Sequence, residues 1–342
     1  TLACHVGRNP LLGIWYDVVL YARSRHEAGW LAGDEAALLE TLQEFIWTLD
    51  PDRRPASSLA AARSILRNLL WRRRALFVLD DVADVQALPR LFIREAGNGL
   101  LAVVASGTVL QDTELHLQRV TLQGWPNEQA RQYVSAVLER ELSEEQIRVV
   151  DELNAWIAGL PIAWAALAEL LFYENNWPDL VEELKVAGAE TARVRAVLAR
   201  LMSRMPAEQQ RLLETWGAFT SHAAADPPAV AFVAGIGEKE ARDGLRSLHR
   251  RHLLHHSQGS GCFELHPILH SFARERLQQS GRLGDLAGRH ARFYADRIRP
   301  LRDEQSSPTW TATVRRILPD LPNVHLGQAW AVEHAPAVAL DY

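Results

Sequence analysis

Two adjacent carboxylates follow an apolar run in the first third of this sequence. The run Ala75-Leu76-Phe77-Val78-Leu79 leads directly into Asp80 and Asp81. An acid at the carboxyl end of a parallel strand lies where Mg²⁺ and a water can meet bound phosphates. We therefore expect Asp80 to hold Mg²⁺ indirectly, through the water shell of the ion, and Asp81 to polarise an attacking water. A structural strand followed by an Asp-rich turn is the alternative interpretation.

Two further motifs lie at predicted starts of helices. Gly159-Leu160-Pro161 introduces an apolar helix, and Pro is well tolerated in a first helical turn, so this motif can also be a simple helix entry. His266 ends a predicted strand directly before Pro267 and a helix, whose exposed N-terminal amides attract anions. This arrangement suits a phosphate sensor, although a histidine at a strand end can also be purely structural.

The elements that would position these residues change character along the chain. Short β-branched or aromatic runs at 16–21, 75–79 and 100–105 predict strands buried on both faces, and 35–70 has helical spacing of leucines around a turn at Asp50-Pro51-Asp52. Strands alternating with helices favour a parallel α/β sheet.

Beyond the sheet the sequence predicts helices. The stretch 127–184 indicates an all-helical module. Helices at 198–219 and 238–248, followed by short strands at 252–256 and 262–266 around a Gly/Ser turn, are typical of a winged helix. The tail is helical, with Trp310, Leu318, Leu321, Leu326 and Trp330 expected to be buried, and it could open a helical repeat array.

At 342 residues the chain is long enough for several domains. The predicted fold class is an α/β parallel-sheet domain, followed by an all-helical module, a winged-helix domain and a helical tail. The expected domains are the α/β domain at 1–125, the helical module at 126–190, the winged helix at 191–280, and a helical linker with the start of a repeat array at 281–342.

Composition excludes several other classes. The net charge of −5 provides no global positive field for a nucleic-acid backbone, so nucleic acid is not the expected partner. The two cysteines match no zinc or redox spacing, and no apolar run reaches the roughly 18 residues that cross a bilayer. These features predict a cytoplasmic protein without a membrane segment.

The order of the motifs resembles one known family. Leu76 to Asp81, then Gly159-Leu160-Pro161, then Leu265-His266-Pro267 are similar to the second acidic motif, the GLPL motif and the MHD motif of NB-ARC proteins, which are STAND signalling NTPases. Residues 120–129 resemble the family's passage into its first helical domain. Leu321-Pro322-Asn323-Val324-His325 with Ala329-Trp330-Ala331 resembles the lead into bacterial tetratricopeptide sensors.

The resemblance implies that 1–125 is a nucleotide-binding domain of the P-loop NTPase type, that 126–190 is its helical lid, and that 281–342 opens a repeat sensor. It also implies an ADP/ATP switch with Mg²⁺. In such a switch Asp80 and Asp81 face the metal and the water, Pro161 packs on adenine, and His266 contacts the β-phosphate. It further implies a homo-oligomer on activation, with a protein or ligand trigger sensed by C-terminal repeats, in roles such as bacterial defence or regulatory control.

The sequence departs from this family at the phosphate-binding loop. It contains no G-x-x-x-x-G-K-[ST], and its only lysines are Lys185 and Lys239. Thr1-Leu2-Ala3 looks like the residues that follow Gly-Lys-Thr, so we expect the loop upstream and assign Thr1 to the nucleotide site. Slow ATP hydrolysis is expected only with that loop, and inactivity without it. Residues 105–108 lack the usual arginine, and Pro267 replaces the aspartate of MHD.

A DNA-binding regulator with a structural NTPase remnant remains the alternative. Winged helices read DNA through a helix in the major groove, and Arg242, Arg246, Arg250 and Arg251 lie on or beside the second predicted helix. Acidic residues share that region. The histidines at 249, 252, 255, 256, 266 and 270 lack a carboxylate or cysteine placed to complete a metal site, so we predict no metal there.

Overall fold

A computed structural model of the chain divides into two compact units, Thr1–Val120 and Thr121–Tyr342, and each is considered by itself. The structure describes residues 15–23, 33–80, 82, 85–92, 100–104, 120–174, 176–185, 190–221, 223–257, 261–303 and 317–342.

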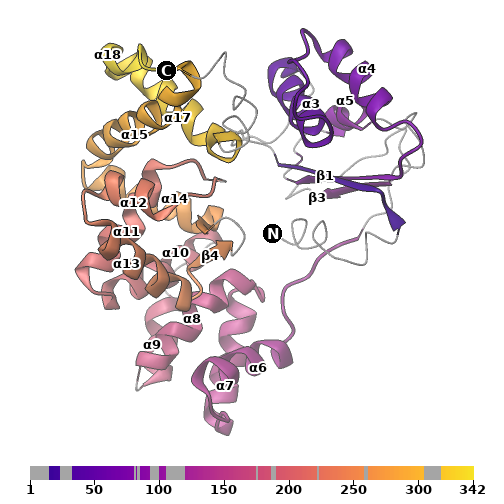
Figure 1. Cartoon of the computed structure of the whole chain (residues 1–342). Coiled ribbons are helices and arrows are strands. Elements are labelled where there is room, and N and C mark those ends of the chain that lie inside the picture. The colour runs from indigo at the N-terminus through magenta and orange to yellow at the C-terminus, as the bar shows by residue number, and fades with distance from the viewer. Residues whose placement is uncertain are drawn as a thin grey trace. The chain divides into compact units, whose positions relative to one another are not determined.

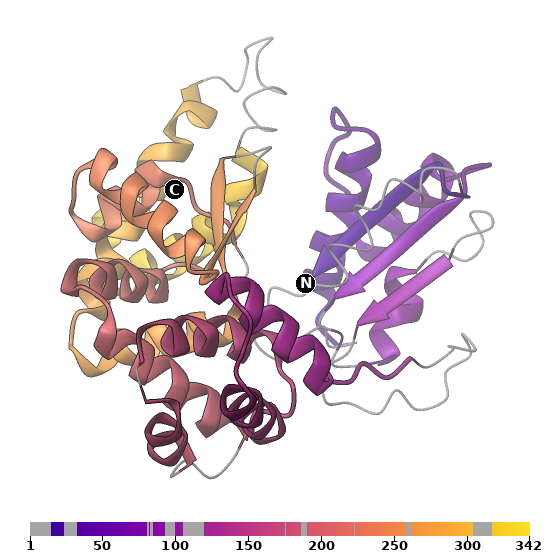
Figure 2. The ribbon, with the colours of Figure 1, turned by 90° about the horizontal axis from the view of Figure 1, so that it is seen from below.

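The first unit contains a three-stranded parallel sheet in the order β1-β2-β3 (Figures 1 and 2). Its strands are β1 (Val18–Arg23), β2 (Ala75–Asp80) and β3 (Leu100–Val104). All six residues of the central strand β2 are buried, as its unbroken apolar run predicts. The prediction that β1 is buried on both faces is wrong, because β1 lies at the edge of the described sheet and Tyr21 is 37% exposed.

Helices cover one face of this sheet. Phe77 of β2 packs edge-to-face on Phe45 and Phe92, with ring centroids 5.7 and 5.2 Å apart, inside a core that also takes in the leucines of α3 and α4. Leu76 and Val78 point to the opposite face, where Tyr16 and Val19 pack on them. The helices that the structure describes in this unit are α3 (Glu35–Leu49), α4 (Leu59–Leu69), the 3-10 helix η1 (Val85–Ala87) and α5 (Leu88–Leu91).

The caps of these helices follow from the sequence. Oδ1 of Asp34 accepts the Ala37 amide at 3.0 Å, and Oγ of Ser58 accepts the Ala61 amide at 3.2 Å, so a short polar side chain begins both α3 and α4. The predicted interruption at Asp50-Pro51-Asp52 is confirmed, because α3 ends at Leu49 and α4 begins at Leu59.

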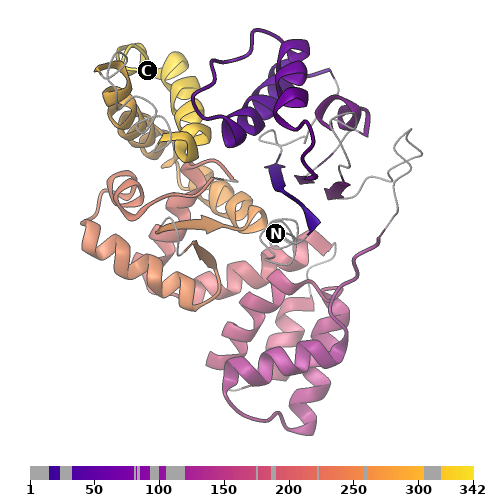
Figure 3. The same cartoon turned by 45° about the vertical axis from the view of Figure 1, so that its right-hand side comes forward.

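In the described residues of the second unit the regular elements are helices and the β4–β5 hairpin (Figure 3). Its first helices are α6 (Asn127–Leu138), α7 (Glu144–Trp156), α8 (Pro161–Tyr173) and α9 (Trp177–Lys185). The chain continues through α10 (Glu190–Arg204), α11 (Ala207–Thr215), η3 (Trp216–Ala218), α12 (Pro227–Ala234), α13 (Glu238–Arg250), β4 (Leu254–Ser257), β5 (Cys262–Leu265) and α14 (Pro267–Gln279). It ends in α15 (Leu283–Asp303), η4 (Leu318–Asp320), α17 (Leu321–His334) and α18 (Pro336–Ala339).

One hydrophobic cluster runs through this unit from Ala130 to Val324. The predicted antiparallel hairpin is confirmed, with Leu254 opposite Leu265 and Ser257 opposite Cys262. The cluster crosses positions 190 and 280 without interruption, so the domain boundaries at those positions stay predictions.

The predicted anchors of the tail are only partly correct. Leu321, Leu326 and Trp330 are half-buried, and the buried residues of α17 are Asn323, Val324, Gly327 and Ala331. A Cβ on Gly327 would lie 3.1 Å from the Cα of Ala291 in α15. Small residues therefore face α15 because the two backbones approach closely. Trp310 and the side chain of Leu318 lie outside the described residues.

Within the part of the chain that the structure describes, no helix is both long and apolar enough to span a membrane.

Candidate functional site

Asp80 occupies the last position of the central strand and is only 3% exposed. It lies beside Arg23 of β1 and Val104 of β3 in the sheet register, and the Tyr21 hydroxyl donates to its Oδ2 at 3.1 Å. The carboxyl end of a central parallel strand is where α/β folds bind ligands. Asp80 therefore lies at the carboxyl end of a parallel strand, as the sequence predicted.

The donor type of Asp80 fits an indirect role toward Mg²⁺. This ion takes oxygen ligands and usually keeps several waters while one or two carboxylates contact it or its shell. Among the described residues no group of three or more His, Cys, Asp or Glu side chains is placed to enclose a metal. A metal at Asp80 would therefore depend on water and phosphate oxygens, as in nucleotide sites.

Two predicted site residues, Asp81 and Thr1, lie outside the described residues, as does the stretch 105–108 where an arginine was expected.

Pro161 is the first residue of α8 and is exposed. The turn before it is tight: Gly159 has φ +67°, which a residue with a side chain rarely adopts. The Trp125 amide donates to the Gly159 carbonyl at 2.7 Å, so the segment that enters α6 runs against this turn. The motif thus begins a helix, as one interpretation predicted, and its proline remains accessible.

A buried asparagine forms hydrogen bonds to this turn and to the segment beside it. Asn154, at 5% exposure, donates through Nδ2 to the Trp125 carbonyl at 2.8 Å and to Oδ1 of Asn127 at 2.9 Å. Its Oδ1 accepts from Nε1 of Trp164 at 2.7 Å. Its backbone carbonyl accepts the Gly159 amide at 2.9 Å.

His266 caps α14 from the end of the hairpin. Its Nδ1 accepts the Ile268 amide at 3.3 Å, and the residue is exposed. One turn later His270 is buried, with its Nε2 2.9 Å from the Phe219 carbonyl. His266 therefore lies at an N-terminus of a helix, which is the predicted anion-attracting position.

Pro161 and His266 belong to the same unit, and α10 packs against both of their helices. Asp80 belongs to the first unit, so it is considered separately from them.

The histidines and arginines around α13 have structural contacts. His249 and His256 lie with ring centroids 5.7 Å apart, and His256 packs on Phe263 at 4.6 Å. Arg251 pairs with Glu169 at 2.7 Å, and Arg242 pairs with Glu238 one turn earlier in the same helix. Arg246 and Arg250 are exposed. Two of the four arginines considered for DNA are therefore engaged by carboxylates.

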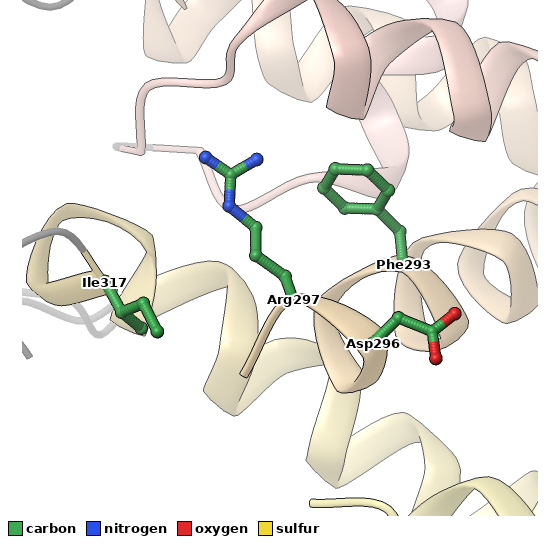
Figure 4. Close-up of a pocket in the computed structure, with 4 residues that line it drawn as sticks. All are labelled: Phe293, Asp296, Arg297 and Ile317. Atoms are coloured by element: carbon green, nitrogen blue, oxygen red, sulfur yellow. The ribbon is translucent and has the colours of Figure 1, made fainter. Parts of the chain in front are cut away.

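A separate cavity of about 390 Å³ is lined by Phe293, Asp296, Arg297 and Ile317 (Figure 4). Arg297 lies 5.5 Å from the Phe293 ring centroid and pairs with Asp226 at 2.9 Å and with Asp320 at 2.7 Å. Burial raises the pKa of the Asp320 carboxyl, which Arg297 lowers and Asp226 raises further. The Arg297 guanidinium thus links α15 to the N-caps of α12 and α17 through two ion pairs.

Sequence reasoning did not identify Asn154, Tyr21 or Arg297. Residue type alone does not distinguish Asn154 from a surface residue of α7. Its place on the same helix face as Val150 and Leu153 was the one available signal, because a polar residue within an apolar stripe must find partners.

Comparisons with known proteins support the fold. No protein-family model matches the sequence, and no curated protein does. Among solved structures the chain is similar to a signal transduction ATPase with numerous domains (STAND) protein with a tetratricopeptide repeat sensor from Pyrococcus horikoshii. The two share 12% identity and a TM-score of 0.55, over 93% of this chain and 46% of the other. The chain thus spans less than half of that protein, and the likeness shows that it has a STAND-like fold.

Proposed function

We propose that this protein is a nucleotide-gated switch and oligomerising scaffold of the STAND type, which ADP holds closed and ATP opens. The main support for this proposal is the position of Asp80, which is buried at the carboxyl end of the central parallel strand of a STAND-like fold. Within this proposal Asp80 holds Mg²⁺ through water, and Asp81 polarises the water that attacks the γ-phosphate.

The second unit supplies the remaining contacts in this proposal. Helices α6 to α9 form the lid, and α10 to α14 with the β4–β5 hairpin form the winged-helix domain. Exposed Pro161 packs on adenine, and His266 at the N-cap of α14 contacts the β-phosphate. The exposure of both residues supports this assignment, since a residue that contacts a ligand must be accessible in at least one state.

Signalling by such a switch depends on its partners. We propose that α15, α17 and α18 begin a helical repeat sensor that receives a protein or ligand trigger in the cytoplasm, and that triggering leads to a homo-oligomer. Slow ATP hydrolysis would reset the switch. Because the sequence contains no G-x-x-x-x-G-K-[ST], phosphate binding requires such a loop outside it.

The test is to denature the natural protein, purified at full length, and to identify the released small molecules by chromatography. Stoichiometric ADP supports the switch. No released nucleotide, together with no binding of a fluorescent ADP analogue in Mg²⁺, contradicts it and leaves the fold as a scaffold.

His266 sharpens this test. His266→Ala should release ADP at least about tenfold faster, because a hydrogen bond to a charged phosphate is worth roughly 1.5–3 kcal/mol. His255→Ala is the matched control, since His255 is an exposed histidine of the same hairpin. Equal release rates in the two variants would remove His266 from the site.

A further inference from the structure

The entry to the second unit runs against the turn that carries Pro161. Residues 121–126 lead into α6, and the Trp125 amide donates to the Gly159 carbonyl at 2.7 Å. The two backbones are in direct contact: a Cβ on Gly124 would lie 1.9 Å from the Ala158 carbonyl oxygen, and one on Gly159 would lie 2.5 Å from the Trp125 nitrogen. Glycines at both positions are therefore needed for this contact.

Asn154 joins the two sides of this contact. Its side chain reaches the Trp125 carbonyl on the entering segment, Oδ1 of Asn127 at the start of α6, and the indole of Trp164 in α8. Its backbone carbonyl holds the Gly159 amide at 2.9 Å. A single residue of α7 thus connects the entering segment, α6, the Gly159 turn and α8.

The chemistry of this position requires an amide. A carboxamide has two N–H donors and one carbonyl acceptor, and Asn154 uses both donors and the acceptor at 2.7 to 2.9 Å. Asp at this position would keep the acceptor for Trp164 but would direct a carboxylate oxygen at two other oxygens. The replacement is nearly identical in shape and opposite in hydrogen bonding.

We propose that Asn154 is a positioning residue, which sets the orientation of the Gly159–Pro161 turn and couples it to the segment 121–126 that joins the two units. This inference rests on the proposed function. In that function a nucleotide contacts Pro161, and through Asn154 this contact also restrains the segment 121–126. Asn154 itself touches the turn from the buried side and contacts no ligand.

The first measurement is amide hydrogen exchange at Trp125 without nucleotide. Asn154→Ala and Asn154→Asp remove the donor to the Trp125 carbonyl, and both should raise exchange of the Trp125 amide at least about tenfold through local opening. Asn323→Ala is the matched control, since Asn323 is an equally buried asparagine of the same unit that bonds to other segments. Wild-type protection at Trp125 in folded Asn154 variants would overturn the proposal.

Asn127→Ala tests the same contact in case the Asn154 variants do not fold. Asn127 is exposed, and its replacement removes one partner of Asn154 without opening the core. It should raise Trp125 exchange by a smaller factor than Asn154→Ala. An unchanged rate would mean that the hydrogen bond between Asn154 and Asn127 does not restrain the turn, and would overturn that part of the proposal.

The second measurement separates positioning from general stability. In the full-length protein a fluorescent ADP analogue should dissociate at least about tenfold faster from Asn154→Asp than from wild type, and at the wild-type rate from Asn323→Ala. Equal acceleration by both variants would overturn the positioning role. A wild-type protein that binds no nucleotide would refute the proposed function, and the exchange measurement would then still decide whether Asn154 couples the turn to the junction.

Discussion

Two buried asparagines of the second unit, Asn154 and Asn323, solve similar problems over different distances along the chain. Asn154 bonds to residues 10, 27 and 29 positions away. Asn323 contacts the loop after η3: its Oδ1 accepts the Thr220 amide at 3.0 Å across 103 positions and approaches Nε2 of His290 at 3.3 Å. Both are at most 5% exposed.

The difference lies in what each asparagine holds. Asn154 shapes a turn whose close backbone contact already requires glycines, so its effect should be felt at Pro161 nearby. Asn323 joins the helical tail to the segment after Phe219, and the ring of Phe219 packs on His290 at 5.1 Å. One residue thus sets local geometry, and the other decides whether distant segments stay docked. A buried polar group can serve either purpose because leaving it unpaired is costly.

The largest effect should come from breaking the glycine contact beside Asn154. Gly124→Ala places a methyl group 1.9 Å from the Ala158 carbonyl oxygen, so one backbone must move. Overpacking of this kind costs about 3 kcal/mol of unfolding free energy, measurable by urea denaturation. Gly284→Ala in α15 is the control, because a Cβ there meets nothing within 4 Å. Similar stability in the two variants would show that the two segments are not in tight contact.

Removing the long-range asparagine should have the next largest effect. Asn323→Ala leaves the Thr220 amide without its acceptor and His290 without its partner, and a buried group left unpaired costs about 2 kcal/mol. Urea denaturation measures the loss. Gln328→Ala, at an exposed position of the same helix, should stay within about 0.5 kcal/mol of wild type. If Asn323→Ala had the unfolding free energy of wild type, the tail would dock through apolar contacts alone.

The smallest effect distinguishes the two asparagines by pH, because only Asn323 has an ionisable partner. Burial lowers the pKa of His290 to about 4, against a smaller raising effect of the Asn323 hydrogen bond. The unfolded chain, with an ordinary pKa of about 6.5, therefore binds the proton first as the pH falls. The stability associated with neutral His290 is complete above pH 6.5 and is lost progressively toward pH 4.

Between pH 7 and pH 5.5 this linkage amounts to about 1 kcal/mol. His290→Gln keeps a donor for Asn323 and removes the titration, so its unfolding free energy should fall less over that interval than that of wild type. Parallel pH profiles for the two proteins would show that His290 is accessible to protons in the folded state.

Much of the fold could be predicted from the sequence. Strand β2 and the hairpin lie where the apolar runs and the Gly/Ser turn place them, because burial on both faces and a tight turn each need a recognisable local composition. The acid at the end of β2 was found for the same reason. The burial of β1 and of the tail was predicted less well, since edge position and backbone approach depend on neighbours that lie far away in sequence.

For this protein the sequence alone determined the order of the strands and helices, and it placed Asp80, Pro161 and His266 at the ends of elements. These features depend on residues within one or two turns of each other. Only the tertiary structure decided that Asn154 and Asn323 hydrogen-bond several segments of the second unit to one another. Hydrogen bonds between distant segments leave no periodic pattern in the chain, and their partners become apparent only when the backbone has brought them within 3 Å.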